Sequence, residues 1–99
     1  PMAEAIDDLT VAYHEGSEEV VRELDKAVLT RGAWTTILFK YTELDRKTGD
    51  FGQTRFTIRR YQKRGDSFIP KSRFNISSVD QAKKIRDTLD GWIAEEEGS

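Results

Sequence analysis

Alternation of apolar and cationic residues in the middle of the chain constrains the fold more than any other feature of the sequence. Residues 55–63 and 68–77 are rich in β-branched and aromatic side chains, which favour strands. Side chains in a strand point alternately to opposite faces of a sheet. Residues 64–67 contain Gly65, which readily adopts the positive φ of a tight turn. The pattern therefore predicts a β-hairpin with one apolar face and one cationic face.

The alternation also predicts which residues share a face. Phe56 and Ile58 lie on one face of the first strand, and Phe68, Phe74 and Ile76 are expected to join them from the second. The opposite face would carry the aromatic Tyr61 among cations, and residues 34–42, a third strand-like stretch, would add Lys40 to it. The expected exposed set is therefore Lys40, Arg55, Arg59, Tyr61, Lys63, Lys71 and Arg73.

The C-terminal segment shows the periodicity of an amphipathic helix. Its start fits a capping box between Ser78 and Gln81. Apolar residues then recur at steps of three and four, at Val79, Ala82, Ile85, Leu89 and Trp92. We expect this stripe to cover the apolar face of the sheet. Pro70 cannot donate to a sheet ladder and is expected at an edge or a bulge.

Residues 17–31 allow two interpretations. Ser17 can cap a helix, and Val20, Val21 and Leu24 recur at helical spacing, so a helix is the better local match for residues 18–25. The competing interpretation is a first strand over residues 26–34 with a kink at Gly32. The sequence leaves both open.

Composition limits the classes of protein that this chain can form. With 99 residues it has room for one small domain. It has no cysteine, which excludes disulfide scaffolds, iron–sulfur sites and thiol chemistry. No apolar run approaches the ~18 residues of a membrane-spanning helix, and the acidic N-terminus lacks the basic and apolar regions of a signal peptide. We therefore expect an intracellular protein with no membrane partner, in a bacterial or phage-infected cytoplasm and nucleoid or in a nucleus.

The net charge of −2 hides a strong segregation of charge. Residues 1–25 carry −7, residues 26–91 carry +8 and residues 92–99 carry −3. A basic body between acidic ends indicates an anionic partner. The expected organisation is a flexible acidic arm at 1–16, a single domain at 17–94 and an acidic tail at 95–99.

A cationic sheet face with an aromatic side chain has a chemical preference. Like charges on neighbouring strands repel each other, so an anion that neutralises them is favoured. Nucleic acid supplies phosphates for Lys and Arg, and an unpaired base can stack on an aromatic ring. The pattern therefore favours single-stranded nucleic acid over duplex.

The remaining candidates for chemistry have simpler explanations. His14 is the only histidine and lies in the acidic arm, and the aspartates at 45, 50 and 66 fit turn chemistry better than a metal site. The serines at 77 and 78 fit a helix cap and have no base placed to activate them. We therefore expect no catalysis, no metal and no cofactor.

The chain resembles the positive cofactor four family, which has the p15 transcriptional coactivator-like, single-stranded-DNA-binding fold. The resemblance covers about residues 26–92. It rests on residues 50–52, on the strand Phe56-Thr-Ile-Arg-Arg-Tyr61, and on the later run from Ile76 to Ile85, with Gly65, Pro70, Ser72 and Arg73 between them.

The resemblance implies a homodimer whose basic ridges hold single-stranded DNA. It also implies that Arg59 contacts the phosphate backbone and that Phe51 stacks on a base, and Arg73 matches a basic residue in the family's proline-containing strand. Gln62 stands where the family often has a second stacking tryptophan, and Phe74 stands where the family tends to have glycine.

Together these observations predict an α+β domain, with a strongly twisted antiparallel sheet of about four strands followed by a C-terminal helix. We expect a homodimer, because so small a core gains from burying Trp34, Leu89 and Trp92 against a second copy. The predicted function is non-catalytic binding of single-stranded DNA or RNA with low sequence preference, in transcription, replication or recombination. The alternative is an adaptor in a transcription complex, whose basic sheet meets an acidic protein; other transcription or replication proteins are possible partners.

Overall fold

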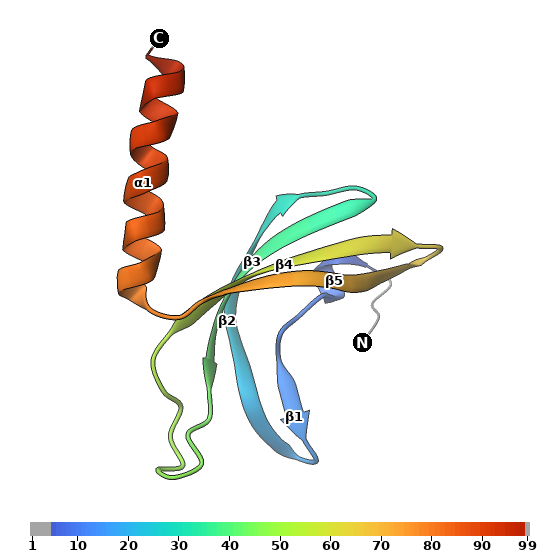
Figure 1. Cartoon of the computed structure of the whole chain (residues 1–99). Coiled ribbons are helices and arrows are strands. Elements are labelled where there is room, and N and C mark those ends of the chain that lie inside the picture. Colours follow the sequence, from blue (N-terminus) through green and yellow to red (C-terminus); the bar gives the residue numbers. More distant parts are fainter. Residues whose placement is uncertain (1–4, 99) are drawn as a thin grey trace.

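The computed structural model describes residues 5–98, which form one curled antiparallel sheet and one long helix (Figure 1). The sheet has five strands in the order β1-β2-β3-β4-β5, one more than expected. The elements are η1 (Ile6–Asp8), β1 (Tyr13–Glu15), β2 (Glu18–Thr30), β3 (Trp34–Glu43), β4 (Arg55–Arg64), β5 (Ser67–Ile76) and α1 (Val79–Glu97). The α+β class and the strands expected over the middle of the chain are confirmed.

Residues 18–30 form strand β2, so of the two interpretations that the sequence left open the helix over residues 18–25 is wrong. The strand interpretation is correct in type, but the strand begins at Glu18 and ends at Thr30, before Gly32. β2 pairs with β3 over most of its length, and two register irregularities leave Leu24 and Leu29 as extra residues on β2. Leu24 is 45% exposed, so it contributes little to an apolar face. The apolar residues of this segment fall at helical spacing because an extra residue at the bulge interrupts the two-residue alternation of the strand.

The buried core lies on one side of the sheet, beneath the N-terminal segment (residues 5–12). Leu9 is 3% exposed and packs with Ile37, Phe39, Tyr61 and Phe68. Lys26 fixes the segment across the sheet, because its Nζ donates to the backbone oxygens of Asp7 at 2.8 Å and Leu9 at 2.7 Å. Residues 5–16, expected as an acidic arm, thus include a strand and part of the core. We call this side of the sheet, marked by Ile37, Phe39 and Tyr61, the covered face.

The opposite side, which we call the open face, carries Leu38, Ile58 and Phe74 next to one another on three strands. Phe56 faces Ile76 on the same side, as expected. The expectation that Phe68 lies with them is wrong, because Tyr61 pairs with Pro70 while Arg60 pairs with Ser72. This bulge leaves Lys71 as an extra residue without a partner in the register. Side chains of β5 that precede the bulge, such as Phe68, therefore point to the face opposite to the one that alternation predicts.

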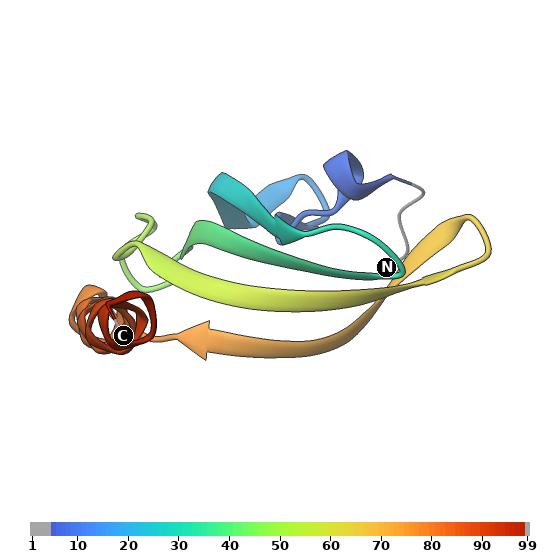
Figure 2. The same cartoon turned by 90° about the horizontal axis from the view of Figure 1, so that it is seen from above.

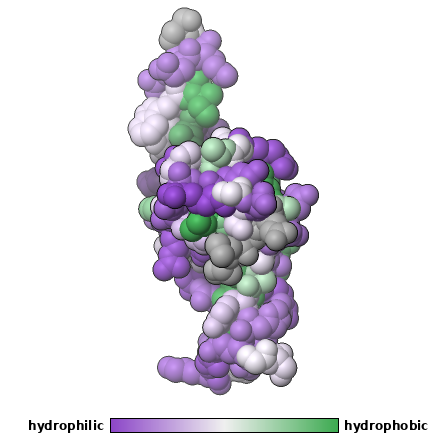
Figure 3. Space-filling model, turned by 90° about the vertical axis from the view of Figure 1, so that its right-hand side faces the viewer, coloured by the Kyte–Doolittle hydropathy of each residue, from purple (hydrophilic) through white to green (hydrophobic). Residues whose placement is uncertain are grey.

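Helix α1 begins at the predicted cap. Ser78 Oγ accepts a hydrogen bond from the Gln81 N–H at 3.0 Å, and Gln81 Oε1 accepts one from the Ser77 N–H at 2.8 Å. The helix then leaves the sheet and extends away from it (Figures 1 and 2). None of its described residues is buried, and Trp92 is 62% exposed. The expectation that α1 covers the apolar face of the sheet is therefore wrong, and apolar side chains along it face solvent (Figure 3).

No helical segment within residues 5–98 combines the length and the apolar character that crossing a membrane requires.

Candidate nucleic-acid interface

The β4–β5 hairpin is the most cationic part of the molecule. Residues 55–76 contain seven lysines and arginines and one acid, Asp66. Arg59 and Arg73 are directly opposite each other in the register, so they share a face as the alternation predicted. The expectation that this is the exposed face of the sheet is wrong, because Arg59 pairs with the buried Ile37 and therefore lies on the covered face. Within residues 5–98, neither forms an ion pair with an acidic side chain. Two guanidinium groups thus lie side by side without a neutralising partner in the described part of the chain.

A partly buried hydrogen-bond network orients Arg59. Its Nε donates to Thr57 Oγ1 at 3.1 Å, and Thr57 Oγ1 donates in turn to Asn75 Oδ1 at 2.7 Å. Thr57 is fully buried, which fixes this network to the sheet. The other guanidinium nitrogens of Arg59 have no partner among the described residues, so they are available to an anion.

The two arginines line a shallow groove at the edge of the sheet. Pro70, Lys71 and Ser72 complete its lining, and Lys71 is the extra residue of the bulge. Arg55 and Lys63 are exposed at the two ends of β4, and their odd positions place them on the face of Arg59. Five of the predicted cations (Arg55, Arg59, Lys63, Lys71 and Arg73) therefore follow one hairpin.

Of the two predicted stacking residues, one is buried and the other is half-buried with an arginine over one face of its ring. Tyr61 is 4% exposed within the core, and burial raises the pKa of its hydroxyl, with Arg59 acting against the rise. The expectation that Tyr61 contacts a base is therefore wrong. Phe51 is half-buried at the end of the loop after β3, where it forms a bridge with Leu44, and the Arg22 guanidinium carbon lies 3.9 Å from its ring centre. One face of this ring is already occupied.

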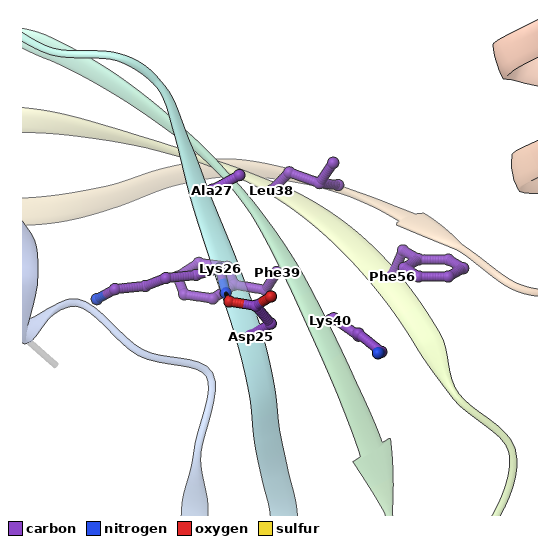
Figure 4. Close-up of a pocket in the computed structure, with 7 residues that line it drawn as sticks. All are labelled: Asp25, Lys26, Ala27, Leu38, Phe39, Lys40 and Phe56. Carbon is purple, nitrogen blue, oxygen red and sulfur yellow. Dashed lines mark hydrogen bonds between the residues drawn. The ribbon is translucent and has the colours of Figure 1, made fainter.

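Lys40 also lies apart from the predicted set. It pairs with Phe56 across β3 and β4, which places it on the open face. Figure 4 shows Leu38, Lys40 and Phe56 on one side of the strands, with Lys26 on the other side. The expectation that Lys40 joins Arg59 is wrong, because its even position in β3 matches the apolar residues of β4.

Three residues on the open face were not predicted as part of the site. Arg60 and Arg64 occupy even positions of β4, and Arg64 Nε donates to Gln62 Oε1 at 3.3 Å. The Arg60 guanidinium carbon lies 4.3 Å from the centre of the Trp34 ring. The signal in the sequence was the pair Arg59-Arg60, because adjacent residues of a strand point to opposite faces.

The described residues show no group of histidine, cysteine, aspartate and glutamate side chains that could hold a metal. Comparison with protein-family models, curated proteins and solved structures found no match for this chain. The evidence for function is therefore the geometry of the hairpin itself.

Proposed function

We propose that this protein binds single-stranded nucleic acid through the β4–β5 hairpin, without catalysis and with low sequence preference. The observation that carries the proposal is the Arg59–Arg73 pair, which lies in register with no acid beside it among the described residues. The proposal agrees with the function that the resemblance to the positive cofactor four family implies.

Electrostatics favours a polyanionic ligand. Like charges directly opposite each other on neighbouring strands destabilise a sheet. Each phosphate that a lysine or arginine neutralises releases counterions, which makes binding favourable at low salt. A chain of phosphates can neutralise Arg55, Arg59, Lys63, Lys71 and Arg73 together, whereas a single small anion can reach only one or two.

The distribution of charge over both faces favours a single strand over a duplex. Arg59 and Arg73 lie on the covered face, and Arg60 and Arg64 lie on the open face of the same hairpin. β5 is an edge strand, so a flexible ligand can pass around it from one face to the other. Duplex DNA is stiff over ~150 base pairs and can meet only one of these faces.

Fluorescence anisotropy with labelled oligo(dT) tests the proposal. The Arg59→Ala/Arg73→Ala protein should bind every oligonucleotide sequence more weakly to a similar degree. The slope of log affinity against log salt should fall in magnitude by about 1.4, since each phosphate contact on a single strand contributes about 0.7. Duplex of the same length should compete poorly.

Lys83→Ala/Lys84→Ala is the matched control, because it removes the same charge from exposed positions of α1. It should leave the salt slope within experimental error of the unaltered protein. Absence of oligo(dT) binding at low salt, or equal effects of the two double variants, would contradict the proposal and favour a protein as the partner of the hairpin.

We also propose that the protein is a homodimer that pairs through α1. Leu89 and Trp92 lie on the exposed apolar stripe of the helix, and Ile85 joins them in lining a shallow apolar pocket there. Most helical stability in proteins comes from packing of an apolar face, and none of the described residues of α1 is buried. A second copy brings an identical stripe. Sedimentation equilibrium tests this, and a monomer at all concentrations would contradict it.

A further inference from the structure

Trp34 and Arg60 form a stacked pair on the open face of the sheet. Trp34 is the first residue of β3 and pairs with Gln62, while Arg60 pairs with Thr36, so the two side chains are diagonal neighbours. The Arg60 guanidinium carbon lies 4.3 Å from the centre of the Trp34 ring. Trp34 is 40% exposed, and Arg60 is exposed as well. A large aromatic ring and a planar cation are thus presented to solvent together.

The backbone around Trp34 is held in place. The N–H of Lys63 donates to the Ala33 oxygen at 2.7 Å, and Thr35 Oγ1 donates to the Gly32 oxygen at 3.1 Å. Thr35 is fully buried on the covered face, which directs its neighbour Trp34 to the open face. A ring on a fixed strand loses little conformational freedom when a ligand binds to it.

The chemistry of this pair fits a nucleobase. Bases stack on aromatic rings regardless of their sequence, and an arginine beside the ring adds a cation–π contribution. Among residues 5–98, no acidic side chain forms an ion pair with Arg60. Only an unpaired base can reach such a surface, since the bases of a duplex are already stacked on one another.

We propose that Trp34 and Arg60 form a stacking site for one unpaired base of the nucleic acid whose phosphates meet Arg59 and Arg73. This inference rests on the proposed function. Arg59 and Arg60 are adjacent in β4 and point to opposite faces, so a strand that passes around the edge of the sheet meets both. Trp34 then contacts the nucleic acid, whereas the sequence suggested that it is buried between two subunits.

Tryptophan fluorescence tests the site directly. The chain has two tryptophans, so Trp92→Phe leaves Trp34 as the only one. Oligo(dT) should quench its emission in a saturable way, with the same midpoint as the anisotropy titration. An abasic oligonucleotide of equal length should bind through its phosphates without that quenching.

Affinity measurements give a second readout. Trp34→Ala should weaken oligo(dT) binding about tenfold, the loss expected for one stacked base, and should change abasic binding less than twofold. Trp34→Phe is the conservative variant and should recover much of the affinity. If Trp34→Ala fails to fold by circular dichroism, the Trp92→Phe titration decides.

The outcomes separate this inference from the proposed function. Binding of oligo(dT) with unchanged Trp34 emission, or equal quenching by the abasic ligand, would overturn the stacking site and leave nucleic-acid binding intact. Absence of binding by both oligonucleotides at low salt would overturn the proposed function, and the stacking site with it.

Discussion

The two faces of the sheet carry similar apolar side chains, but the core cluster lies on only one of them. Ile37 and Phe39 on the covered face are fully buried, whereas Phe74 on the open face is 54% exposed. The difference arises from what lies over each face. Residues 5–12 place Leu9 on the covered face, and α1, which could have covered the open face, extends away from it (Figure 2).

This contrast shows that alternation alone does not decide which face of a sheet becomes the core. Alternation correctly separates Phe56 and Ile58 from Arg59, but both faces of β3 are apolar, with Ile37 and Phe39 on one and Leu38 on the other. A short segment with a few well-placed apolar residues then selects the face that is buried. The other face remains largely exposed, as the 54% exposure of Phe74 shows.

The largest expected effect comes from weakening the contact between residues 5–12 and the covered face. Leu9→Ala should lower the free energy of unfolding by about 3 kcal/mol, because a buried leucine is replaced with a cavity. Urea denaturation measures this. Leu24→Ala, at an exposed bulge position, should cost less than about 0.5 kcal/mol. Equal losses at the two positions would mean that residues 5–12 do not form part of the core.

A smaller effect is expected at the exposed helix. Leu89→Ala should weaken self-association about tenfold, which corresponds to ~1.4 kcal/mol, because it shortens the apolar stripe. Sedimentation equilibrium compares it with Lys83→Ala, which lies off that stripe and should leave the association unchanged. Identical association constants for the two variants would show that α1 does not join the subunits.

The smallest expected effect is on the pH dependence of the free energy of unfolding, through Tyr61 on the covered face. Burial raises the pKa of Tyr61 above the ordinary value of 10.0. The folded protein therefore holds this proton more tightly than the unfolded chain. The resulting stabilisation is complete at a pH below the pKa of Tyr61 in the unfolded chain. It is lost as the pH rises through the higher pKa of Tyr61 in the folded protein.

Tyr61→Phe should therefore lose less stability than the unaltered protein between pH 8.5 and pH 11, as measured by urea denaturation at each pH. A pH dependence that is the same in the two proteins would indicate that Tyr61 is accessible to solvent in the folded state.

The parts of the fold that the sequence predicts are those determined by neighbouring residues. The β4–β5 hairpin follows from alternation and from Gly65, whose φ is +59°. The start of α1 follows from Ser78 and Gln81, whose side chains make reciprocal hydrogen bonds at the cap. The shared face of Arg59 and Arg73 follows from the register of that hairpin.

The parts that could not be predicted depend on distant contacts or on bulges. Extra residues at Leu24 and Lys71 change the period of two within a strand. Pro70 correctly predicts an edge or a bulge next to Lys71, but no local signal in the sequence marks Leu24. Burial of Tyr61 depends on Leu9, which lies more than 50 positions earlier in the chain. The exposed stack of Trp34 and Arg60 likewise depends on the pairing of β3 with β4.

The edges of the sheet limit how copies of this protein can assemble. β1 is only three residues long, and β5 is interrupted by Pro70, which has no N–H, and by the adjacent bulge. The β5 edge therefore offers no long, regular row of free backbone groups, which disfavours the addition of a strand from another copy at that edge.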